Sequence, residues 1–180
     1  MSNDRKPFTP EEVHRICLAI DQLRQFTEGY LHTRRLDCDP RASPHLRLFM
    51  GAGLITYLDG FYENRRAGLL PILRLVGFNR AADGIEQALD TPIGPKRFGE
   101  IQRALRNKHI AHPQFDPKCC AEVVEAHRHI KATGDTFRNA DRQLKTITAS
   151  LFPMFEKYFP QLVEETNRWL RITEGLEDPT

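Results

Sequence analysis

The sequence predicts an all-α protein, an up-and-down helical bundle of about five to seven helices. Apolar residues recur at spacings of three and four along most of the chain, which is typical of amphipathic helices. Thr, Ser or Asp followed by proline marks several helix starts, and no stretch alternates apolar and polar residues as a strand does. The length of 180 residues suits one buried core. We therefore expect a single domain over 1–180, with flexible tails at 1–8 and 175–180.

The first long helix is predicted from Thr9 to about Arg35. Thr9 is placed as the N-cap, Pro10 as the first helical residue and Glu12 where a capping box requires an acid. A loop over 36–42 is expected to follow. The predicted apolar stripe of this helix consists of Val13, Ile16, Cys17, Ile20, Leu23, Thr27, Tyr30 and Leu31.

The second predicted helix starts at Ser43-Pro44 and runs to about Arg66. It is apolar on nearly every side, which favours a place in the middle of the bundle or at an interface. Pro71 is expected to kink or break a short helix within 67–78, and Asn79 is expected to cap the next one.

A firm break is predicted at Thr91-Pro92-Ile93-Gly94-Pro95, after which Pro95 opens a helix that reaches His112. Pro113 ends it, because proline disfavours helical geometry at the residue before it.

Asp116-Pro117 starts the following helix, which Gly134 is expected to close. Its predicted apolar positions are Val123, Val124, His127 and Ile130. A long helix begins at about Thr136, and Pro153 and Pro160 are expected to bend or divide it. Its predicted stripe is Phe137, Ala140, Leu144, Ile147 and Leu151, continued by Leu162, Val163, Thr166, Trp169 and Leu170.

Composition predicts an ordinary soluble protein of the cytoplasm. Hydrophobic residues make up 40%, charged residues 28%, and the net charge is +2. The four cysteines show no disulfide framework, and the N-terminus is too polar for a signal peptide. The longest uncharged run, 48–58, is too short to span a bilayer, so no membrane association is expected.

The segment that carries chemistry is Leu105 to Pro113, with the sequence LRNKHIAHP. At the helical repeat, Phe98, Ile101 and His112 fall within about 60° of one another, so His112 continues the buried face. A histidine at a helix C-terminus is stabilised in its charged form, which suits a proton-transfer group.

Arg106-Asn107-Lys108-His109-Ile110-Ala111-His112 resembles the R-x(4–6)-H motif of the HEPN superfamily, and is most similar to members linked to abortive infection. The sharp match covers about eight residues, and the rest of the likeness is an all-helical chain. The resemblance implies a homodimeric, metal-independent and cofactor-free ribonuclease of a toxin–antitoxin or antiviral defence system. It also implies RNA as the substrate and a cognate antitoxin or regulatory protein as a possible partner.

Under this resemblance, His112 acts as general base or acid, Arg106 holds phosphate, and Asn107 orients the substrate. Attack by a ribose 2′-hydroxyl needs a proton acceptor, a donor and positive charge, which two copies of the motif across a two-fold axis supply. Lys108, His109 and Arg103 are the predicted substrate-binding residues. Glu63 either steadies the motif arginine or pairs with Arg66 at the surface.

Three other interpretations stay open. In the first, both residues are structural: His112 is a core histidine satisfied at a helix end, and Arg106 pairs with a carboxylate. The basic residues Lys96, Arg97, Arg103, Arg106 and Lys108 oppose only Glu100 and either hold phosphates or form a solvated helix face. A structural metal on His109, His112, Cys119, Cys120, His127 and His129 is disfavoured by the adjacent cysteines. The alternative function is a non-catalytic HEPN-like dimerisation or RNA- or protein-binding module.

Overall fold

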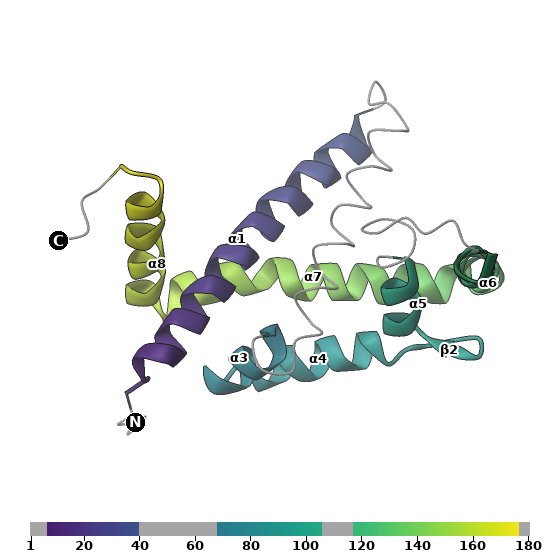
Figure 1. The fold of residues 1–180 in the computed structure, drawn as a ribbon, viewed down its shortest axis with the longest axis horizontal. Helices are drawn as coiled ribbons and strands as arrows, with labels where there is room; N and C mark the ends of the chain where they lie inside the picture. Colours follow the sequence, from purple (N-terminus) through teal and green to yellow (C-terminus); the bar gives the residue numbers. More distant parts are fainter. Residues whose placement is uncertain (1–6, 40–67, 106–116, 177–180) are drawn as a thin grey trace.

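The computed structural model describes residues 7–39, 68–105 and 117–176 (Figure 1). Helices make up nearly all of these ranges, and one hairpin of two short strands accompanies them. The all-α prediction is therefore confirmed. None of the described helices is long and apolar enough to cross a membrane. The helix predicted over 43–66 lies outside the described residues.

Helix α1 (Pro10–Cys38) begins with the predicted capping box. The Thr9 amide donates to Glu12 Oε2 at 2.8 Å, and the Glu12 amide donates back to Thr9 Oγ1 at 3.3 Å. The predicted end at Arg35 is wrong by three residues, so 36–38 are helix and not loop. The reason is that Pro40 is the first helix breaker in this region, and it restricts only the residue immediately before it.

The buried face of α1 differs from the prediction at its C-terminal end. Ile16, Cys17, Ile20 and Leu23 are buried as predicted, but Leu31 is 49% exposed. Phe26, which the predicted stripe omitted, is 1% exposed. In Figure 1 the C-terminal part of α1 extends past the other described helices, so the periodic stripe continues beyond the helices against which it packs.

Helices α3 (Leu69–Leu75) and α4 (Asn79–Leu89) form a compact corner. Pro71 does not break α3, because it lies in the first turn, where a backbone N–H has no partner within the helix. Asn79 does not cap α4 either: Phe78 occupies the N-cap and no side chain caps the helix. Gly77 closes α3 with φ 84°, the left-handed geometry of a Schellman motif, and the Phe78 amide donates to the Leu73 carbonyl at 2.7 Å.

A tight hairpin, not a proline-initiated helix, follows the predicted break. Strands β1 (Pro92–Ile93) and β2 (Lys96–Arg97) pair antiparallel, with Ile93 opposite Lys96. Gly94 has φ 63°, which a two-residue hairpin loop requires at its first central position. Pro95 is therefore part of this turn, and helix α5 (Phe98–Leu105) begins three residues later than predicted.

The last helices are α6 (Pro117–Ala132), α7 (Gly134–Tyr158) and α8 (Pro160–Thr173). Pro117 starts a helix as predicted, and the chain is divided before Pro160 as predicted, whereas α7 runs through Pro153 without a division. Gly134 starts α7 instead of closing α6, because its backbone is not in the left-handed region that a closing glycine adopts. Val124 was predicted to pack, but it is 55% exposed.

Helix α7 is the central element of the described fold. Helix α1 crosses it, α4 lies along it, and α8 turns back at its C-terminal end (Figure 1). Ala140, Leu144 and Leu151 of its predicted stripe are buried, and Phe155 extends the stripe. Phe78 lies edge-on to Phe155, with ring centroids 5.2 Å apart, and so joins the α3–α4 corner to α7.

Candidate functional site

Helix α5 leads directly into the predicted motif and is firmly anchored to the core. Phe98 and Ile101 are both 0% exposed, as the helical repeat predicts. The Phe98 ring packs on Phe137 of α7, with centroids 4.9 Å apart. At the start of the helix the Glu100 carboxylate accepts a hydrogen bond from the Arg97 amide at 2.9 Å. The segment before the motif therefore has a fixed position.

Gly99 lets α5 approach α4 closely. A Cβ at this position would lie 3.3 Å from the Leu89 carbonyl oxygen, a backbone atom that cannot move easily. The absence of a side chain thus sets the spacing between α5 and α4, and with it the direction in which α5 points.

Gln102 is an unusual buried group in this helix. It is 0% exposed, and neither its amide nitrogen nor its amide oxygen has a hydrogen-bond partner in the part of the chain that the structure describes. A buried amide without a partner destabilises a fold by about 1–3 kcal/mol. The helical repeat from Phe98 already placed this glutamine on the buried face, but the sequence analysis did not single it out.

Of the predicted site residues, only Arg103 belongs to the described part of the chain. It is exposed on α5. Arg106, Asn107, Lys108, His109 and His112 lie outside the described residues, and so does Glu63. The roles predicted for them remain predictions.

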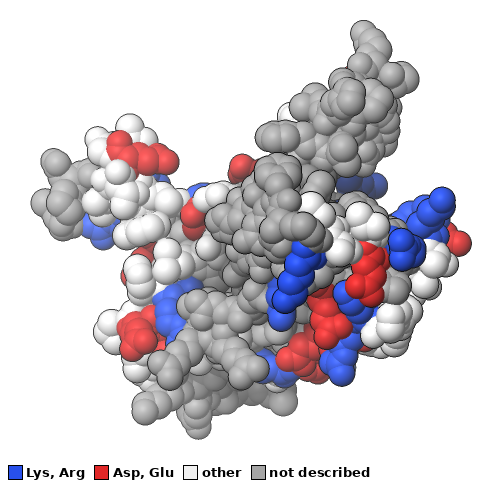
Figure 2. Space-filling model, turned by 45° about the vertical axis from the view of Figure 1, so that its right-hand side comes forward, with Lys and Arg blue, Asp and Glu red and all other residues white. Residues whose placement is uncertain are grey.

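Acidic residues of neighbouring elements pair with two members of the expected basic cluster, Lys96 and Arg97. Lys96 lies 3.6 Å from the Glu125 carboxylate of α6, and Arg97 pairs with Asp90 at 2.8 Å. Figure 2 turns this end of the molecule toward the viewer, and on its described part acidic and basic side chains alternate. The solvated-face interpretation therefore holds for Lys96 and Arg97.

Within 7–39, 68–105 and 117–176, no group of three or more His, Cys, Asp or Glu side chains is placed to hold a metal ion. Two of the histidines considered as ligands, His109 and His112, lie outside these ranges.

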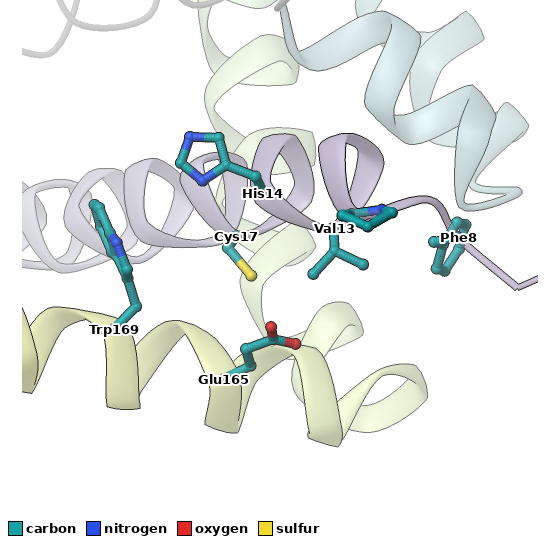
Figure 3. A pocket seen from close by; sticks show the side chains of 7 residues that line it. Phe8, Val13, His14, Cys17, Glu165 and Trp169 are labelled. Carbon is teal, nitrogen blue, oxygen red and sulfur yellow. The ribbon is translucent and has the colours of Figure 1, made fainter. Parts of the chain in front are cut away.

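A pocket of about 390 Å³ lies between the N-terminal part of α1 and α8 (Figure 3). Its lining consists of Phe8, Pro10, Val13, His14, Cys17, Glu165 and Trp169. In Figure 3 the Glu165 and Trp169 side chains rise from α8 toward α1, and Cys17 and Val13 point from α1 toward α8. No sequence signal predicted this pocket, because its two walls are about 150 residues apart in the chain.

Cys17 does not have the features of a catalytic nucleophile. The side chain is only 6% exposed, and its thiol faces the Leu162 carbonyl oxygen at 3.9 Å. Burial raises the pKa of the Cys17 thiol, a hydrogen bond with Thr166 partly offsets this, and the Glu165 charge adds to it. The His14 ring points away from the sulfur and lies edge-on to Trp169 at 6.4 Å. The pocket is therefore suited to binding and not to thiol chemistry.

The chain matches no protein-family model, and neither curated proteins nor solved structures give a significant match to it.

Proposed function

We propose that this chain is a metal-independent endoribonuclease of the HEPN type, acting in the cytoplasm as part of a toxin or antiviral defence system. The observation that carries the proposal is the segment from Arg106 to His112, with Asn107 after the arginine. Two described features support it: the fold is all-α, and α5 is anchored by Phe98 and Ile101 directly before the motif. The proposal includes a HEPN-like arrangement of the helices as an up-and-down bundle.

The proposed reaction is attack by a ribose 2′-oxygen on the adjacent phosphorus. The bond to the 5′-oxygen of the next nucleotide breaks, leaving a 2′,3′-cyclic phosphate and a 5′-hydroxyl. His112 removes or returns the proton, and Arg106 stabilises the charge that develops on the phosphate. Asn107 orients the phosphodiester, and Lys108, His109 and Arg103 contact flanking phosphates. RNA is selected over DNA because the nucleophile is the 2′-hydroxyl.

One copy of Arg106 and His112 supplies too few groups for base, acid and charge stabilisation together. We therefore propose a homodimer in which a two-fold axis brings two motifs to one cleft. A cognate antitoxin or regulatory protein would act by covering this cleft or by separating the two subunits. No metal or nucleotide cofactor takes part in the proposed step.

The test is cleavage of a single-stranded RNA by purified protein in the presence of a chelator. Arg106→Ala and His112→Ala are each expected to lower the rate by about 100-fold or more, the usual contribution of a positioned acid, base or charge. Arg97→Ala and His32→Ala are matched controls, because Arg97 is already paired with Asp90 and His32 is exposed on α1. Both controls are expected to retain wild-type activity.

An RNA with a single 2′-deoxy substitution at the cleaved position tests the nucleophile and should resist cleavage at that position. A mixture of the two inactive variants tests the dimer. Each mixed dimer retains one intact arginine and one intact histidine, so partial recovery of activity is expected. If Arg106→Ala and His112→Ala cleave RNA as the wild type does, or if the wild type binds RNA without cleaving it, the enzyme proposal fails. The alternative, a non-catalytic HEPN-like dimerisation or RNA- or protein-binding module, would then account for the chain.

A further inference from the structure

The pocket between α1 and α8 combines an apolar wall with a single negative charge. Phe8, Val13 and Trp169 supply apolar and aromatic surface, and Glu165 is the one carboxylate among the described residues that line it. Among the described residues, no lysine or arginine lines the pocket. A volume of about 390 Å³ suits a small ligand, since such sites usually measure about 300–1,000 Å³.

Glu165 has no described counter-ion. No ion pair or hydrogen bond joins its carboxylate to another residue of the described ranges, whereas other carboxylates of these ranges, such as Asp90 and Asp141, pair with a lysine or arginine. Figure 3 shows the carboxylate rising from α8 beside Cys17 and Val13, with the Trp169 ring on the same side of the helix. The negative charge of Glu165 also contributes to raising the pKa of the nearby Cys17 thiol. The carboxylate is thus available to a ligand.

Trp169 is the only tryptophan of the chain and is 38% exposed at the edge of the pocket. Indole is the aromatic ring that attracts cations most strongly, because its face carries negative electrostatic potential. Aromatic rings beside a carboxylate are the arrangement by which proteins recognise ammonium groups. An exposed indole next to Glu165 therefore favours a positively charged ligand with an apolar body.

The N-terminus of α1 borders the same pocket and by itself attracts anions. This end already has its own acceptors, however: the Glu12 amide donates to Thr9 Oγ1, and the Glu12 carboxylate accepts hydrogen bonds from the Thr9 amide and hydroxyl. Glu11 adds a second negative charge to this turn. The N-terminus of α1 therefore does not reverse the preference of the pocket for a cation, which Glu165 sets.

We propose that the pocket between α1 and α8 binds a small organic cation, an ammonium group on an apolar body, with the charge at Glu165 and the body against Trp169 and Val13. The binding is independent of the proposed ribonuclease site, since none of these residues belongs to α5 or to the motif. It offers a place where a metabolite of this chemical class can influence the protein.

The test uses benzyltrimethylammonium chloride as the probe and the fluorescence of Trp169 as the signal, at constant ionic strength. Saturable quenching or a spectral shift is expected, and benzyl alcohol, which has the ring without the charge, should bind at least about fivefold more weakly. Glu165→Gln is expected to lower the affinity for the probe by about five- to tenfold. Glu164→Gln is the matched control, because Glu164 is the neighbouring exposed glutamate and does not line the pocket. It should change the affinity by less than about twofold.

Calorimetry with Trp169→Leu supplies a measurement that does not depend on the fluorophore, and at least about a fivefold loss of affinity is expected. Glu165 and Trp169 are both exposed, so their variants should fold, which circular dichroism checks. The proposal is overturned if the wild type shows no saturable binding, if benzyl alcohol binds as tightly as the cation, or if Glu164→Gln and Glu165→Gln weaken the probe equally. RNA cleavage by Arg106→Ala and His112→Ala tests the other site separately.

Discussion

Replacing Gln102 by methionine should make the protein more stable. Gln102 is completely buried in α5, and both polar atoms of its amide lack a hydrogen-bond partner among the described residues. Methionine has almost the same length and shape, is a good helix former, and places no hydrogen-bonding group in the core. The substitution thus removes the cost of desolvating the amide without leaving a cavity.

The expected gain follows from that cost. A buried polar group without a partner destabilises the folded state by about 1–3 kcal/mol, so Gln102→Met should raise the free energy of unfolding by about 1–2 kcal/mol. For a chain of this size each kcal/mol corresponds to about 2–4 °C in the thermal midpoint. Both quantities are within the range that routine unfolding measurements resolve.

Urea denaturation followed by circular dichroism measures the effect. Gln143→Met is the matched control, because Gln143 is exposed on α7 and the same substitution there should change stability by less than about 0.5 kcal/mol. The reasoning is refuted if Gln102→Met unfolds at a lower urea concentration than the wild type, since the amide would then have a partner that the substitution removes. Equal changes in the free energy of unfolding of the two variants would refute it as well, because burial of Gln102 would then not be the cause of the gain in stability.

Three further predictions concern stability. Thr9→Ala should lower the free energy of unfolding by about 1 kcal/mol, and combining it with Glu12→Ala should cost less than the sum of the two, because each residue supplies half of one capping box. Gly77→Ala should destabilise by about 1–2 kcal/mol in the same urea denaturation assay, because alanine is strained at φ 84°. Gly134 has an ordinary helical conformation, so Gly134→Ala should be neutral or stabilising. Burial raises the pKa of the Cys17 thiol above 9.0, so the stability linked to its proton is present below pH 9.0 and is lost as the pH rises through the higher pKa of the folded state. Unfolding measured across this alkaline range should therefore depend less steeply on pH in Cys17→Ala than in the wild type, and identical slopes would contradict the assignment.

Helix starts were the most predictable part of the fold. The starts predicted at Pro10 and Pro117 are both confirmed, because a proline in the first turn fits helical geometry and loses no hydrogen bond there, and at Pro10 the Thr9–Glu12 capping box acts within one turn and needs no tertiary partner. Pro95 shows the limit of the same rule. The proline there belongs to a hairpin turn, because Gly94 adopts a positive φ and the strands on either side pair.

Stripes of apolar residues predicted burial only where a second element covers them. Leu144 and Leu151 are buried on α7, whereas Leu31 on α1 and Val124 on α6 have the same periodicity and are exposed. Periodicity states which residues share a face, but not how far the neighbouring helix extends along it.

For the candidate site, the chain by itself determined the motif, its order and the chemistry that Arg106 and His112 suit, since these depend on residue type and spacing alone. The tertiary structure decided which of the described charges pair: Lys96 and Arg97 pair with acids of other elements, whereas Glu165 has no such partner among the described residues. It also decided that residues of α1 and α8, about 150 positions apart, form one pocket. The physical reason is the separation along the chain over which each interaction acts. Caps and turns act between neighbouring residues, whereas burial and charge pairing depend on which distant helices fold against each other.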